Sequence, residues 1–223
     1  MTGSPRKRVA VLISGRGSNM MALVNASRAA DYPAEIALVI SNKLDAAGLA
    51  WAREQNLQTA AIDHKAFPSR ESFDAAIDAA LVAAQIDYVA QAGFMRIQTA
   101  GFVEKWAGRQ INIHPSLLPL FKGLHPQRQA LEAGVRVSGA SVHFVTPELD
   151  SGPIIAQGVV PVVAGDTEDR LAERILAIEH RIYPAALALV VEGKAKLVGG
   201  RVSLEAPVNQ RQTLVSPGGE RVC

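Results

Sequence analysis

Short apolar runs that alternate with longer mixed segments are the feature that most constrains the fold. The run over 9–13, Val-Ala-Val-Leu-Ile, is apolar throughout, which is typical of a strand buried on both faces of a parallel sheet. We expect four more strands, at 36–40, 59–62, 88–90 and 111–113. The intervening helices are expected at 20–30, 46–55, 69–84 and 99–106. This β-α-β-α order predicts a doubly wound, Rossmann-like sheet.

The pattern changes after Pro126. A helix is expected over 127–133, and two strand-like runs follow at 139–145 and 154–162, separated by a loop typical of an antiparallel pair. A long helix then begins at 166 with acidic residues in its first turn, and Pro184 either kinks it or starts its continuation. The prediction is one α/β domain, with a mostly parallel sheet and an antiparallel addition in the C-terminal half.

The expected domain covers residues 9–204, without internal repeats or linkers. Residues 1–8 form an N-terminal tail in this prediction, with a solvated basic cluster at 6–8. Residues 205–223 are rich in Pro, Gly, Gln and Ser and are expected to form a mobile C-terminal tail.

Composition excludes several classes of function. The 223 residues are 48% hydrophobic with a formal net charge of +2, which is too small to indicate a nucleic-acid partner. The single cysteine, Cys223, allows neither an internal disulfide nor a cysteine metal site, and it fits a reducing cytoplasm. The apolar runs are too short for a secretion signal or a membrane span. We therefore expect an unprocessed cytoplasmic protein that binds no membrane; its oligomeric state is not fixed, and a homodimer stays open.

A glycine loop joins the first strand to the first helix. Gly15 and Gly17 allow a tight turn, and the free amides at a helix N-terminus form an anion site to which Ser18 and Asn19 add donors. Either of these two polar residues could cap the helix. The spacing is neither a complete dinucleotide fingerprint nor a Walker loop, so a single phosphate fits better than a pyrophosphate. An ordinary strand–helix turn remains the alternative.

Asn112 and His114 share one face of a strand that stops at Pro115. At the carboxyl end of a parallel strand they lie where open α/β sheets place their sites. Asp150, in the loop between the antiparallel strands, could approach His114 and favour its protonated form. An amide and a cationic imidazole can stabilise an oxyanion, while a carboxylate can manage a proton. A structural histidine and a turn aspartate are the competing interpretation.

The other four histidines are weaker candidates. His64 is expected in a solvated loop, His143 at a half-exposed strand position, and His180 in a structural role on the long helix. His125 could line a pocket. Neither a His-x-x-x-His motif nor a carboxylate cluster indicates a catalytic metal.

These segments together resemble the folate-dependent phosphoribosylglycinamide formyltransferase family. The resemblance runs from about Val9 to about Leu197, and it is carried by several long stretches in a fixed order. They are Ile-Ser-Gly-Arg-Gly-Ser-Asn at 13–19, Ser-Asn-Lys at 41–43, Ala-Gly-Phe-Met-Arg-Ile at 92–97, Ile-Asn-Ile-His-Pro-Ser-Leu-Leu-Pro at 111–119, Gly-Leu-His at 123–125, Gly-Ala-Ser-Val-His-Phe-Val at 139–145, Leu-Asp-Ser-Gly-Pro-Ile at 149–154 and Glu-His at 179–180.

The resemblance implies roles for individual residues. It implies a catalytic trio of Asn112, His114 and Asp150, and no metal or redox cofactor. It implies substrate-binding residues for glycinamide ribonucleotide and positions that hold 10-formyltetrahydrofolate, the co-substrate. The residues implied for glycinamide ribonucleotide are Gly17, Ser18, Asn19 and Glu179. The positions implied for 10-formyltetrahydrofolate are Arg70, Met95, Arg96, Ile97 and Gln98.

Two positions depart from the family pattern. Gln98 stands where an aliphatic residue is common, and Pro126-Gln127 follows His125 where a polar residue and a second histidine are frequent. The resemblance further divides the domain into a ribonucleotide-phosphate half, 9–113, and a folate-binding and catalytic half, 114–204.

Other formyl-folate enzymes share the stretch around His114. Methionyl-tRNA formyltransferase has an additional C-terminal domain and lacks this glycine loop, and formyltetrahydrofolate deformylase has an extra N-terminal domain; this sequence is expected to have room for neither. A nucleotide-binding oxidoreductase would need a pyrophosphate loop. A non-catalytic ligand-binding protein is the remaining alternative.

Overall fold

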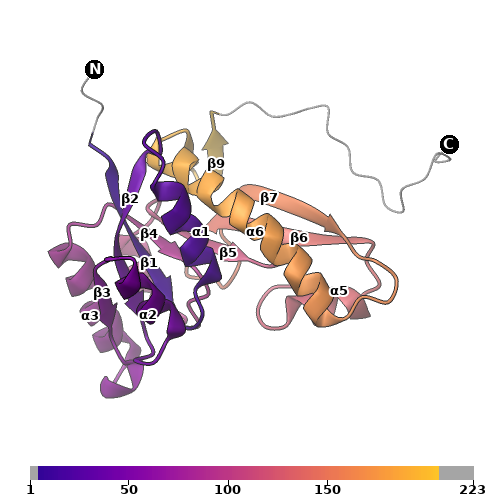
Figure 1. Cartoon of the computed structure of the whole chain (residues 1–223). Coiled ribbons are helices and arrows are strands. Elements are labelled where there is room, and N and C mark those ends of the chain that lie inside the picture. Colours follow the sequence, from indigo (N-terminus) through magenta and orange to yellow (C-terminus); the bar gives the residue numbers. More distant parts are fainter. Residues whose placement is uncertain (1–4, 206–223) are drawn as a thin grey trace.

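A computed structural model describes residues 5–205 (Figure 1). The first strands and helices alternate along the chain: β1 (Lys7–Ile13), α1 (Ser18–Ser27), β2 (Ala34–Ser41), α2 (Ala47–Glu54), β3 (Thr59–Ala61), α3 (Arg70–Ala83), β4 (Tyr88–Gln91), α4 (Ala100–Lys105) and β5 (Gln110–His114). A short 3-10 turn, η1 (His64–Ala66), precedes α3. The second half contains α5 (Pro126–Glu132), β6 (Val137–Phe144), β7 (Ile154–Pro161), α6 (Glu168–Val191), β8 (Ala195–Val198) and β9 (Arg201–Leu204).

Seven strands form the main sheet in the order β3-β2-β1-β4-β5-β6-β7. Those from β3 to β5 run parallel, whereas β6 and β7 add antiparallel to the β5 edge. The predicted fold class is therefore confirmed. The small β8-β9 hairpin was not expected from the sequence.

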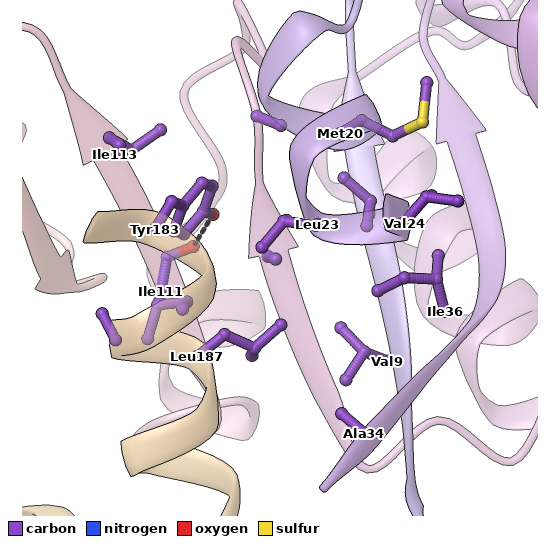
Figure 2. Close-up of a cluster of buried hydrophobic side chains, with 14 of the residues drawn as sticks. Val9, Met20, Leu23, Val24, Ala34, Ile36, Ile111, Ile113, Tyr183 and Leu187 are labelled. Atoms are coloured by element: carbon purple, nitrogen blue, oxygen red, sulfur yellow. Dashed lines mark hydrogen bonds between the residues drawn. The ribbon is translucent and has the colours of Figure 1, made fainter. Parts of the chain in front are cut away.

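Helices cover both faces of the sheet. One face packs against α1, α2 and α6, and the other packs against α3 and α4. Figure 2 shows the first of these cores, where Leu23 of α1 and Leu187 of α6 lie beside Val9 and Ile111 of the strands. Burying both faces explains why the central strands are apolar at every position.

Several local predictions differ from the structure. The first strand begins at Lys7 rather than Val9, because Arg8 pairs with Glu35 at 2.7 Å and continues the ladder with β2. Arg6 bonds to the carbonyls of Ser27 and Ala34, so the basic cluster is not a solvated tail. Pro184 lies inside α6, which continues to Val191. Residues 1–4 and the expected C-terminal tail beyond 205 lie outside the described residues.

Candidate active site

The glycine loop turns through a left-handed residue rather than through a polar cap. Gly17, at φ +73°, is the N-cap of α1, and no side chain caps the helix. The expectation that Ser18 or Asn19 caps α1 is therefore wrong. The first amides of α1 stay free of side-chain partners, which keeps this end of the helix available for an anion.

Glu179 reaches the same loop from α6. Asn19 Nδ2 donates a 2.8 Å hydrogen bond to Glu179 Oε2, although the two residues lie 160 positions apart in the sequence. Glu179 is buried, and burial raises its pKa to about 7, while the bond from Asn19 acts in the opposite direction. The structure thus brings together the loop and the distant carboxyl that the resemblance assigned to one substrate.

His114 and Asp150 face each other in a buried position. His114 Nδ1 lies 3.3 Å from Asp150 Oδ2, which also accepts the backbone N–H of Gly123 at 2.9 Å. On the other side of the ring, His114 Nε2 lies 2.9 Å from the Phe121 carbonyl oxygen. Both ring nitrogens therefore face acceptors, and only a ring with a proton on each nitrogen can donate to both.

Asn112 is the third member of the group. The β5-β6 register pairs it with His143, and Asn112 Nδ2 lies 3.2 Å from His143 Nε2. His143 Nδ1 lies 2.8 Å from the Phe144 carbonyl oxygen, so this nitrogen carries the proton and Nε2 accepts from Asn112. One hydrogen of the Asn112 amide is thereby used, and the second remains to donate to a ligand.

His143 is the residue that sequence reasoning missed. It is buried rather than half-exposed, and its Nε2 lies 3.9 Å from Asp150 Oδ1. Burial lowers the pKa of His143, and the Phe144 carbonyl acts in the opposite direction. Strand alternation with Val142 and Phe144 could not reveal this role, because the antiparallel pairing of β5 with β6 creates the contact with Asn112.

The predicted folate positions differ in how far they are exposed to solvent. Met95 and Ile97 expose 62% and 56% of their surface in the segment between β4 and α4, and Arg70 is exposed at the start of α3. Arg96 is half-buried. Other large apolar side chains are exposed on the loops around Asp150 and Phe121, namely Leu120, Leu124 and Leu149. Apolar surface of this kind suits a flat, largely apolar ligand.

Gln98 points away from solvent. Its Oε1 accepts from Gln91 Nε2 at 2.7 Å and from Gln110 Nε2 at 2.5 Å, and all three glutamines are buried. We call these three residues the glutamine cluster. Gln91 lies on β4 and Gln110 lies on β5. Their hydrogen bonds to Gln98 therefore fix the segment 95–98 to the sheet.

Residues 5–205 contain no group of three His, Cys, Asp or Glu side chains arranged to hold a metal ion. Over the same residues, the structure has no helix that is both long and apolar enough to span a membrane.

Comparison with known proteins decides the family. A model described as formyl transferase matches residues 7–187 of the chain. This chain belongs to the formyl transferase family. Phosphoribosylglycinamide formyltransferase from Escherichia coli (strain K12) is 46% identical over 189 residues, covering 85% of this chain and 89% of that protein.

Two further relatives place the chain within the formyl transferase family. The trifunctional purine biosynthetic protein adenosine-3 of Homo sapiens is 51% identical over 192 residues, which make up 86% of this chain but only 19% of the human protein. The crystal structure of glycinamide ribonucleotide transformylase 1 from Symbiobacterium toebii has a TM-score of 0.87 and 46% identity, covering 92% of this chain and 99% of that one. The chain thus spans less than a fifth of the human trifunctional protein and nearly all of the bacterial ones.

Proposed function

We propose that this chain transfers the formyl group of 10-formyltetrahydrofolate to the amine of glycinamide ribonucleotide, in de novo purine biosynthesis. The observation that carries the proposal is the buried 3.3 Å pair of His114 Nδ1 and Asp150 Oδ2 beside Asn112. The names of the bacterial relatives, which this chain covers almost completely, support the choice of substrates. The proposed place of action is the cytoplasm.

In the proposed reaction the amine of the ribonucleotide attacks the formyl carbon directly. A C–N bond forms, and the formyl oxygen becomes an oxyanion stabilised by the second Asn112 hydrogen and by cationic His114. Asp150, directly or through a water molecule, accepts the proton that the attacking amine loses. The tetrahedral intermediate then collapses, its C–N bond to the folate breaks, and the folate nitrogen takes up the proton that Asp150 accepted. No covalent enzyme intermediate forms.

The substrates would lie on either side of this trio. The ribonucleotide phosphate would bind at Gly17, Ser18 and Asn19, with Glu179 as a further contact. The pteridine would bind along the segment 95–98, held by backbone groups near Arg96 and Ile97, with Arg70 at its rim. The half 9–113 would supply the phosphate loop, the segment 95–98 and Asn112, and the half 114–204 would supply His114, Asp150 and Glu179, so the two halves are proposed to meet at the trio.

A turnover assay tests this proposal. The protein is mixed with 10-formyltetrahydrofolate and glycinamide ribonucleotide, and deformylated folate is followed by absorbance. We expect turnover that requires both substrates. Turnover with methionyl-tRNA instead, or with water alone, would identify one of the other formyl-folate activities.

Asp150→Asn provides the matched test of mechanism. It removes the proton acceptor, and we expect kcat to fall by at least about 100-fold. Asp78→Asn is the control, because Asp78 pairs with Lys105 and accepts from Trp106 Nε1, and neither partner belongs to the trio. Full activity in Asp150→Asn would contradict the proposed role of this carboxylate.

A further inference from the structure

Ser14 and Asn42 meet at the carboxyl ends of two neighbouring strands. Ser14 follows β1 and Asn42 follows β2, and the register pairs Ile13 with Ser41 directly before them. Ser14 exposes 4% of its surface and Asn42 exposes 2%. The distance from Ser14 Oγ to Asn42 Oδ1 is 2.5 Å. Neither side chain has a part in the proposed chemistry.

The hydrogen bonds of this pair have only one consistent direction. The backbone N–H of Met95 lies 2.8 Å from Ser14 Oγ, and a backbone N–H can only donate. The single hydroxyl hydrogen of Ser14 must then go to Asn42 Oδ1. This order turns the Asn42 amide nitrogen toward His64.

His64 completes the arrangement in the 3-10 turn η1. Its Nδ1 lies 3.2 Å from Asn42 Nδ2 and 3.1 Å from the Asn42 carbonyl oxygen, so the ring can hold Asn42 in either neutral tautomer. His64 is therefore bonded to the protein, contrary to the solvated loop position expected from sequence. We call Ser14, Asn42 and His64 the serine relay.

The serine relay links the two segments proposed to bind the two substrates. Ser14 directly precedes the glycine loop, and Met95 is the first residue of the proposed folate segment. Asn42, Ser14 and Met95 follow β2, β1 and β4, and β1 lies between the other two strands, so the hydrogen bonds cross the ends of three adjacent strands. The far end of the folate segment is held separately, where Asp74 Oδ2 accepts the backbone N–H of Thr99 at 2.6 Å.

We propose that Ser14 and Asn42 are positioning residues that fix the backbone of Met95, and hence the folate-binding segment, in its binding conformation. The role assigned to this segment depends on the proposed formyl-folate function. Without the Ser14 hydroxyl the Met95 N–H has no protein acceptor, so the segment turns toward water and must be reordered when folate binds. The relay acts through Met95 and touches no reacting atom.

Two measurements on Ser14→Ala test the proposal. Hydrogen exchange at the Met95 amide, measured without substrates, is expected to quicken about tenfold, as loss of one hydrogen bond predicts. In the turnover assay, KM for formyl-folate is expected to rise about tenfold, with kcat and KM for the ribonucleotide changed by less than about twofold. A general loss of structure would move all three constants together.

Matched variants separate positioning from stability. Asn42→Ala keeps the Ser14 oxygen but no longer orients its hydroxyl, so it should change exchange at Met95 and KM for formyl-folate in the same direction as Ser14→Ala but less. Asn42→Asp keeps the Oδ1 acceptor and should leave KM for formyl-folate at the wild-type value. Ser27→Ala is the control, because it removes another buried hydroxyl, one that bonds to Val24 within α1.

Each result has a defined consequence. Unchanged exchange at Met95 in Ser14→Ala would overturn the link itself, whatever the enzyme's substrates prove to be. Faster exchange with an unchanged folate KM would overturn the positioning role. A wild-type protein without turnover would refute the proposed function, while the exchange measurement would still decide whether Ser14 holds Met95.

Discussion

Asn19 and Glu179 are joined by a 2.8 Å hydrogen bond that fastens the first turn of α1 to the middle of α6. The bond places a buried carboxyl directly beside the glycine loop. Tyr183, one turn further along α6, donates a 2.6 Å hydrogen bond to the Gln91 carbonyl oxygen and ties the same helix to β4. Figure 2 shows the Tyr183 ring among the core side chains. The position of Glu179 is therefore fixed from both sides of its turn.

The buried Glu179 predicts a specific dependence of stability on pH. Its folded pKa of about 7 lies above the ordinary value of 4.5, so between these values the folded state binds more protons than the unfolded state. The free energy of unfolding contributed by this group is then greatest below pH 4.5 and declines as pH rises through 7. The expected decline is about 3 kcal/mol.

Glu179→Gln should remove this pH dependence. Urea unfolding gives the free energy of unfolding of wild type and variant at pH 5 and at pH 8. The difference in this free energy between the two proteins is then compared at the two pH values. Glu192→Gln, which removes an exposed carboxylate at the end of α6, serves as the control. A difference between wild type and Glu179→Gln that stays constant from pH 5 to pH 8 would show that Glu179 titrates normally.

His143 is expected to position Asn112 for the reaction. His143→Ala removes the acceptor for one Asn112 amide hydrogen, so the amide can rotate away from the developing oxyanion. A single neutral hydrogen bond of about 1 kcal/mol corresponds to a loss in kcat of about fivefold to tenfold. Ser203→Ala, at an exposed position on β9, is the control in the same turnover assay. An undiminished kcat in His143→Ala would mean that Asn112 needs no support from β6.

The glutamine cluster predicts an unusual pattern of stability. Gln98→Leu leaves the amide nitrogens of Gln91 and Gln110 buried without their acceptor, at a cost of about 2 kcal/mol. Replacing all three glutamines by leucine removes the stranded donors as well. We therefore expect the triple variant to unfold at a higher urea concentration than Gln98→Leu alone. If the triple variant instead unfolds at the lower urea concentration, the glutamine cluster stabilises the fold by more than the removal of its buried polar groups does.

Gly48 supports the glycine loop from α2. A Cβ at this position would lie 2.6 Å from Ile13 Cδ1 and 3.0 Å from the Gly15 carbonyl oxygen. Gly48→Ala should thus push the loop outward and raise KM for the ribonucleotide about tenfold, with little change in kcat. Gly101→Ala is matched to it, because a Cβ at Gly101 in α4 would meet no atom within 4 Å. Equal KM values in the two variants would exclude a role for this contact.

Much of the fold could be predicted from local pattern. The apolar runs around Val11 and Val39 are continuous because both faces of a parallel strand are covered by helices, and this leaves a signal in the sequence itself. Element boundaries were less predictable. The sequence offers Ser18 or Asn19 as a cap for α1, but a left-handed Gly17 makes the turn, and Asn19 uses its side chain for Glu179 instead.

The sequence by itself determined the α/β alternation, the antiparallel addition and the chemical types available to the site. It also brought Asn112 and His114 to one strand face, because alternation along a strand is a local property. Only the tertiary structure decided which groups those side chains meet: His143 for Asn112, Asp150 for His114, and Met95 for Ser14. Hydrogen bonds form over about 3 Å in space, and the separation of two residues along the chain does not fix that distance.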